Sequence, residues 1–252
     1  MRRRVLLLRG LAVLFAVSWI VFPGFGAIDL SVTWDPEWEQ VLEAGWGLYF
    51  TVIVGVPFVV AAVRPRASRA GVAQLAVASA VLAISAVVAQ EIGALVLAGM
   101  LGLETAVVAW LARRDWPPTP EAPVSRVFVA LAAVGALPWL AYALDMWDLN
   151  RREVNETDIT NGVDHYSVQG GVGLALAVLP ALASFRPGLR PLVPACAGVV
   201  AAYLGLVSYA WPDAAGGFSR PWSVAAIAWG ALLVAVAAVP VVRGRARVAS
   251  LE

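Results

Sequence analysis

The chain has 252 residues, of which 61% are hydrophobic and 14% are charged, and its formal net charge is +1. A soluble domain of this length would need a far more charged surface, so the composition excludes one and predicts an integral membrane protein. All 18 basic residues are arginine, and a chain without lysine cannot form a retinal Schiff base or any other lysine imine.

Apolar runs long enough to cross a bilayer core of about 30 Å as helices recur along the whole chain. The predicted fold class is therefore an all-α integral membrane protein with eight transmembrane helices. The first run is interpreted as a retained helix, because no small-residue cleavage site of a signal peptide is clear. The eight predicted spans are 5–25, 45–63, 70–90, 92–112, 127–146, 166–185, 191–211 and 221–242.

Arginine is concentrated at alternate ends of these spans. Fifteen of the 18 arginines lie at one set of ends with three acidic residues, whereas the other set has three arginines and 13 acidic residues. Because cytoplasmic loops carry the excess of Lys and Arg, both termini are predicted to be cytoplasmic. The lysine-free, Ala/Val/Arg-rich composition indicates a GC-rich bacterial genome, and we expect the chain to lie in the cell membrane.

Two landmarks indicate a duplicated unit of four helices. Residues 11–20 align without gaps on residues 131–140, and a proline in the second span matches one in the sixth. Units with an even number of spans share one orientation, so this would be a parallel 4+4 repeat, as in some transporters. Chance similarity between apolar helices is the alternative. The predicted units are 1–126 and 127–250, and residues 251–252 are interpreted as a cloning scar.

The first long external loop contains the sequence Asp-Pro-Glu at residues 35–37. Aspartate at the N-cap and proline at the first helical position are typical of a helix start. Trp38 follows directly, and tryptophan is favoured where a membrane meets water. We therefore expect a short interfacial helix to begin here.

Glu104 is the only carboxylate well inside the predicted hydrocarbon region. It lies nine residues before Arg113, or about 13 Å from the cytoplasmic end of its helix. An ionisable side chain at this depth is costly, which makes it a candidate for binding a proton or an ion. The alternative is a protonated glutamic acid that is hydrogen-bonded to a neighbour such as Gln74, Ser79 or Tyr203.

A second polar cluster is predicted where the sixth span begins. Asp164 is expected to cap this helix, and His165 and Gln169 then share one face because they are four residues apart. Asp145 and Asp148 lie in the same predicted loop and would attract an external cation or a basic ligand. Oxygen ligands of this kind bind calcium, but the spacing matches no EF-hand. A capped loop without a ligand is the alternative.

Cys196 and His165 are the only cysteine and the only histidine. They exclude a disulfide framework, a thiolate metal cluster and a multi-histidine zinc site within one chain. The glycine-rich phosphate loop of ATPases is missing too. We therefore predict no cofactor, no confident metal site and no ATP-driven activity. Lipid, and not nucleic acid, is the expected partner.

Three functions are compatible with these features. The first is a carrier or facilitator of a small polar or cationic solute, coupled through Glu104. The second is an outer-surface enzyme or sensor in which His165 and Asp164 are the catalytic candidates, since histidine exchanges protons near neutral pH. The third is an accessory subunit without a site of its own. It would form a homo-oligomer or bind a membrane partner through two stripes of small residues: Ala94, Ala98, Gly102 and Ala106, and Ser167, Gly171 and Ala175.

Overall fold

The computed structural model describes residues 2–117, 123–152 and 159–249, which are mostly helical. Among these residues the strands are β1 (Ile159–Thr160) and β2 (Val163–Asp164). The α-helices are α1 (Arg2–Ile20), α2 (Gly26–Val32), α3 (Gln40–Leu48), α4 (Val56–Val63), α5 (Ser68–Ala89), α6 (Ile92–Ala112), α7 (Arg126–Arg151), α8 (His165–Phe185), α9 (Val193–Ala210) and α10 (Arg220–Ala249). A π-helix, η1 (Tyr49–Gly55), joins α3 to α4, and short 3-10 turns are η2 (Pro65–Ala67), η3 (Arg113–Asp115) and η4 (Pro187–Leu189).

Seven helical segments among the described residues are long and apolar enough to cross a membrane. Each overlaps one of the predicted spans, and the architecture is that of an all-α membrane protein. The helix α1 occupies most of the predicted span 5–25 but contains four arginines, and it is not one of these seven. The seven are Gln40–Val63, Pro65–Ala89, Ile92–Ala112, Arg126–Arg151, His165–Phe185, Val193–Ala210 and Arg220–Val239.

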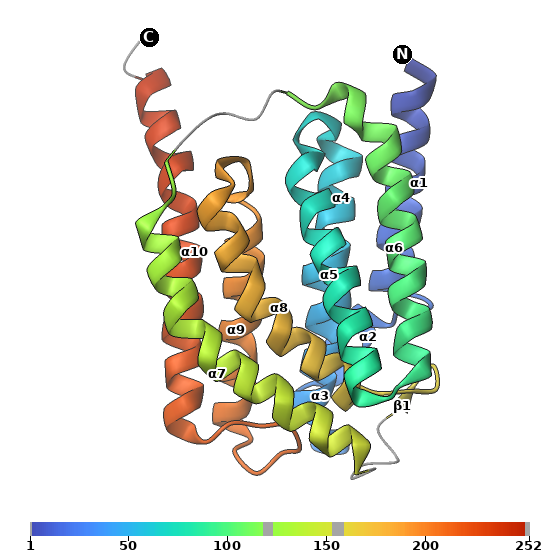
Figure 1. Ribbon diagram of the computed structural model, residues 1–252, viewed down its shortest axis with the longest axis vertical. Coiled ribbons are helices and arrows are strands. Elements are labelled where there is room, and N and C mark those ends of the chain that lie inside the picture. Colours follow the sequence, from blue (N-terminus) through green and yellow to red (C-terminus); the bar gives the residue numbers. More distant parts are fainter. Residues whose placement is uncertain (1, 118–122, 153–158, 250–252) are drawn as a thin grey trace.

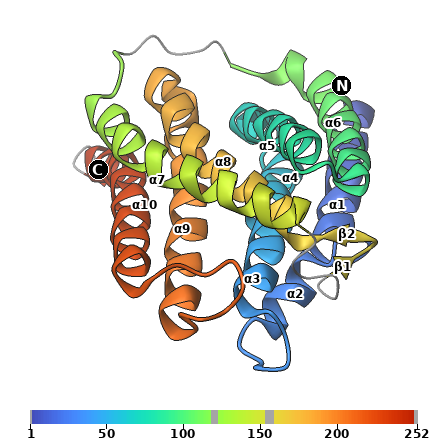
Figure 2. The same ribbon diagram turned by 60° about the horizontal axis from the view of Figure 1, so that its bottom comes forward.

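The two ends of the bundle differ in what they carry. The start of α1, the end of α10 and the α4–α5 and α8–α9 turns lie at one end, at the top of Figure 1. We call this the arginine end, because residues 64–69 and 186–190 contribute five arginines to it. Figure 2 brings the opposite end forward, where α2, α3 and the two strands lie. We call this the acidic end, because α2 carries Asp29 and α3 carries Glu43.

The centre of the bundle is formed by the segment Gln40–Val63 and by α8, most of whose residues are buried. Within the first of these, η1 departs from regular α-helix. Two side-chain hydrogen bonds connect this part to α5: Gln74 Nε2 donates to the Ile53 carbonyl (2.9 Å), and the Tyr49 hydroxyl donates to the Ala78 carbonyl (2.6 Å). Because hydrocarbon offers no hydrogen-bond partners, such bonds stabilise an irregular backbone inside a membrane.

The two stripes of small residues face α5 of the same chain. Ser79 Oγ on α5 donates to the Ala98 carbonyl on α6 (2.9 Å) and lies beside Gly102. Ser85 Oγ donates to the Ser167 carbonyl on α8. Small residues let helices approach closely, so α5 packs between α6 and α8.

The prediction that an interfacial helix begins at residues 35–37 is wrong. Asp35 Oδ1 accepts a hydrogen bond from the Glu37 amide (3.0 Å), and the chain forms a turn there. An aspartate side chain that bonds the backbone two residues on stabilises a turn as readily as it caps a helix. The helix of this region, α2, ends before the turn, and α3 begins after it at Gln40.

We expect the glycine contact between α9 and α10 to be required for stability. A Cβ added at Gly198 would lie 2.5 Å from the Gly230 carbonyl oxygen, which is too close for any side chain. Gly198→Ala should therefore separate the two helices and destabilise the fold by about 1–3 kcal/mol. Thermal unfolding of the purified protein in detergent measures this effect.

Gly99→Ala is the matched control, because a Cβ at Gly99 meets nothing within 4 Å. It should leave the unfolding temperature unchanged or slightly raised, since alanine is the better helix former. Equal losses in the two variants would contradict this account of the α9–α10 contact.

Candidate functional site

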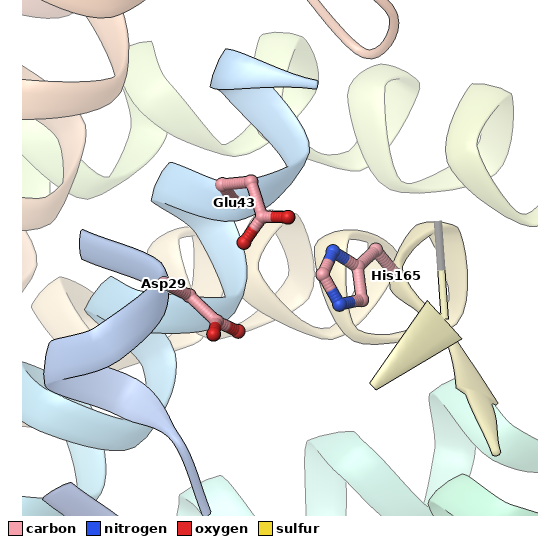
Figure 3. A group of neighbouring side chains, drawn as sticks. All are labelled: Asp29, Glu43 and His165. Carbon is pink, nitrogen blue, oxygen red and sulfur yellow. The ribbon is translucent and has the colours of Figure 1, made fainter. Parts of the chain in front are cut away.

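Three buried side chains meet at the acidic end of the bundle. Asp29 from α2, Glu43 from α3 and His165 from α8 each offer one ligand atom, and these atoms lie within 4.8 Å of one another. Only 6%, 3% and 1% of the respective residue surfaces are exposed. Figure 3 shows the two carboxyl groups and the imidazole turned toward one another. We call this group the acid–histidine cluster.

Asp29 and Glu43 are brought together because α2 packs tightly on α3. A Cβ added at Gly47 would lie 2.7 Å from the Gly26 carbonyl oxygen and 2.6 Å from Leu30 Cγ, so only glycine permits this contact. The hydroxyl of Thr33 donates to the Asp29 carbonyl (3.2 Å) at the end of α2. The short helix α2 is thereby held against α3.

His165 is positioned by the turn between β1 and β2. Asn161 and Gly162 both have positive φ angles (57° and 75°), as in the turns favoured by two-residue hairpins. The hairpin places Thr160 Oγ1 at 2.8 Å from His165 Nε2. Asp164 then caps α8 by accepting a hydrogen bond from the Tyr166 amide (2.8 Å), which confirms its predicted capping role.

Trp46 supports the other side of the imidazole. Its ring stacks on His165 with centroids 4.7 Å apart and an interplanar angle of 26°. Trp46 Nε1 donates to the Gly24 carbonyl (2.8 Å), and this bond orients the indole. The histidine ring is therefore held by a stacked neighbour and by a hydrogen-bond partner at Nε2.

The structure separates the predicted polar residues of this region into two groups. Gln169 lies one turn below His165 on α8 and is buried; its Nε2 donates to the Tyr142 hydroxyl (2.5 Å) and to the Val41 carbonyl (3.4 Å). Asp145 and Asp148 lie on α7, which continues to Arg151 and includes part of the predicted loop. Among the described residues they join no group of metal-ligand spacing.

Asp145 is exposed, and Asp148 forms surface ion pairs with Arg151 (3.5 Å) and Arg152 (2.6 Å). These contacts give Asp148 a partner within its own helical turn. Exposed pairs of this kind contribute little to stability. Within the described residues, neither aspartate is part of the acid–histidine cluster.

The hydrogen-bond partner of Glu104 lies on α1. Trp19 Nε1 on α1 donates to Glu104 Oε2 (2.5 Å), so Glu104 is hydrogen-bonded to a neighbouring helix, as the alternative had it, but through Trp19 and not through Gln74, Ser79 or Tyr203. The side of α6 that carries Gly102 faces α5, while the side that carries Glu104 faces α1. Figure 1 shows α1 and α6 at one edge of the bundle. Glu104 therefore connects two outer helices.

Asp29 and Glu43 were missed because both were assigned to an external loop. Glu43 follows the apolar residues Val41 and Leu42, and the second span begins at Gln40 rather than at residue 45. An acidic residue inside an apolar run of helical length was the signal that this assignment overlooked. No comparable signal marks Asp29, whose helix is only seven residues long.

The acid–histidine cluster has the donor set of a divalent metal site. One imidazole nitrogen with two carboxylate oxygens suits zinc and other first-row metals. Tetrahedral ligands at about 2.1 Å from zinc lie about 3.4 Å apart, so separations up to 4.8 Å need only small side-chain rotations. When Nε2 donates to Thr160, Nδ1 is the nitrogen that would bind the metal. Histidine ligands are usually oriented by such a bond from the other ring nitrogen.

No protein-family model, no curated protein and no solved structure matches this chain.

The packing of α8 against α3 beside the cluster depends on Gly45. A Cβ added there would overlap Gln169 Oε1. We expect Gly45→Ala to displace the Gln169 side chain from Tyr142 and to destabilise the fold by about 1–3 kcal/mol. Thermal unfolding in detergent measures the loss.

The double variant Gly45→Ala/Gln169→Ala provides the control. Removing the amide relieves the overlap, so the double variant should lose less stability than the sum of the two single variants. Strict additivity would show that Gly45 and Gln169 do not constrain each other.

Proposed function

We propose that the chain is a multi-pass protein of the cell membrane that binds one divalent transition-metal ion at Asp29, Glu43 and His165, on the non-cytoplasmic side. The observation that carries this proposal is the convergence of three buried ligand atoms, from three separate elements, within 4.8 Å. Two carboxyl groups and one imidazole in a buried group provide three ligand atoms, and a divalent cation carries the charge that two carboxylate ligands would neutralise. Sites of this donor set with three protein ligands keep a coordination position for water or a small ligand.

The surroundings of His165 support a site at which a metal-bound water or small ligand can be exchanged. A divalent metal at this position would make a bound water lose a proton more readily than a water molecule in bulk solvent does. Trp46 stacks on the imidazole, and Thr160 Oγ1 lies within hydrogen-bond distance of its Nε2, so both contacts orient the ring. The proposal therefore corresponds to the outer-surface enzyme or sensor, with Asp29 and Glu43 replacing Asp164 as the partners of His165.

The proposed topology has eight spans, with α1 as the first, and both termini in the cytoplasm. The distribution of arginine supports it, since 15 of 18 lie at alternate ends of the predicted spans. The start of α1 and the end of α10 also lie at the same end of the bundle, as an even number of crossings requires (Figure 1). The acid–histidine cluster lies at the opposite end, which this topology places outside the cytoplasm.

A carrier coupled through Glu104 has less support. Coupling would require the carboxyl group to reach a cavity that opens to each side in turn. Glu104 is instead hydrogen-bonded to Trp19 between two helices at the edge of the bundle. Its bond to Trp19 gives it a role in helix association.

The metal proposal is tested by titrating chelator-treated protein in detergent with Co²⁺, whose visible absorption reports its ligands, and with Zn²⁺. Wild-type protein should bind one ion per chain. Glu43→Gln and His165→Ala each remove a ligand and should weaken binding by about tenfold or more. The unfolding temperatures of the metal-free variants establish that they are folded.

Asp145→Asn is the matched control, because it removes one exposed negative charge at the same end of the bundle. It should leave the dissociation constant within about twofold of wild type, since an exposed charge acts only through screened solvent. Absence of binding to the wild-type protein, or an equal loss in Asp145→Asn and Glu43→Gln, would overturn the metal site.

The topology is tested by cysteine labelling on intact cells with a membrane-impermeant maleimide. The background is Cys196→Ser, which removes the single, buried cysteine. Glu37→Cys, in the turn before α3, should be labelled from outside. Arg3→Cys and Arg114→Cys should react only after the membrane is permeabilised. Labelling of Arg114→Cys in intact cells would show that the orientation is the reverse of the proposed one. Labelling of Arg3→Cys alone would show that α1 does not span the membrane.

A further inference from the structure

A hollow of about 350 Å³ opens at the arginine end of the bundle, far from the acid–histidine cluster. It lies where the start of α5, the end of α8 and η4 meet, and these elements are in contact. Arg66 and Arg69 line it from the α5 side, and Arg186 lines it from the α8 side. The hollow therefore brings together three guanidinium groups from two segments that are more than 100 residues apart in the sequence.

The described side chains that line this hollow carry only positive charge. Among the described residues the lining includes no acidic side chain, and none of the three arginines forms an ion pair. Guanidinium groups bind phosphate oxygens through paired N–H donors, which makes arginine the preferred side chain for such recognition. Three arginines around one hollow thus fit a phosphate-bearing ligand.

Arg69 is held in place before any ligand binds. Its guanidinium lies over the Trp116 ring, 5.8 Å from the centroid. Trp116 Nε1 donates to Ser68 Oγ (3.0 Å), and Ser68 Oγ in turn donates to the Pro65 carbonyl (2.6 Å). A side chain that is already ordered loses less entropy on binding, so this arrangement favours affinity.

The inner wall of the hollow is apolar. Ala70 and Ala73 on α5 and Leu182 on α8 continue it about one helical turn beyond the arginines, toward the middle of the spans. A small soluble phosphate has no apolar part that would cover such a wall. A phospholipid, whose glycerol and first methylene groups follow its phosphate into the bilayer, would cover it.

We propose that this hollow binds an anionic phospholipid, with the headgroup phosphate between Arg66, Arg69 and Arg186 and the start of an acyl chain against the apolar wall. Basic pockets between membrane helices recognise such headgroups in this way. The site is independent of the proposed metal site, because it uses other residues at the other end of the bundle.

The test measures lipid binding to the full chain in neutral detergent, by native mass spectrometry and by the shift in unfolding temperature. The probes are phosphatidylglycerol, phosphatidylcholine and inorganic phosphate. Wild-type protein should bind phosphatidylglycerol about tenfold more tightly than phosphatidylcholine. The triple variant Arg66→Gln/Arg69→Gln/Arg186→Gln should lose this roughly tenfold preference, because it removes the three positive charges that line the hollow.

The matched control is Arg64→Gln/Arg113→Gln/Arg114→Gln, which removes the same charge from exposed positions at the same end outside the hollow. It should retain the preference within about twofold, since these arginines act only through screened charge. If the first triple variant unfolds without lipid, Arg186→Gln alone is measured, with Arg114→Gln as its control.

Three results would overturn the proposal. Equal binding of the two lipids by the wild type would show that the hollow does not select an anion. Equal losses in the two sets of variants would assign the preference to general charge. Displacement of phosphatidylglycerol by millimolar inorganic phosphate would make a soluble phosphate compound the ligand in place of a lipid.

Discussion

The hydrocarbon of a bilayer cannot form hydrogen bonds, and this constraint determines how the polar residues of the chain are used. Regular helices satisfy their own backbone groups, and several buried polar side chains bond carbonyls where a helix is irregular or ends. Gln74 bonds the Ile53 carbonyl in η1, and Asn150 Nδ2 donates to the Ala89 carbonyl (3.3 Å) at the end of α5. Trp147 Nε1 donates to Ser85 Oγ (2.5 Å). Much of the buried polarity therefore has a structural role.

Glycines decide which helices can lie close enough to build that cluster. Helices in lipid associate through close packing, and a residue without a side chain permits the closest contact. Gly47 allows α2 to pack closely on α3, and Gly45 leaves room for the Gln169 side chain between α3 and α8. The same principle applies at Gly198 and Gly230, where α9 meets α10. The positions of Asp29, Glu43 and His165 thus depend on close contacts that Gly45 and Gly47 permit.

Hydropathy predicted the spans well because it is a property of consecutive residues, and seven of the eight predicted spans recur as long apolar helices. The repeat and the orientation of the termini stay predictions. The acid–histidine cluster could not be predicted from consecutive residues, because Asp29 and Glu43 come close to His165 only through the packing of α2 on α3 and of α3 on α8. Local signatures were also ambiguous: Asp164 caps a helix as predicted, whereas Asp35 forms a turn with the same kind of bond.

One helix connects the two ends of the molecule. His165 is the first residue of α8 and Arg186 follows its last, so the 21 residues of this helix extend about 31 Å from the acid–histidine cluster to the arginine-lined hollow. Most of α8 is buried, which keeps it from moving without its neighbours. The cation proposed at one end and the anionic lipid proposed at the other use different residues, and each would secure a different end of the same central helix.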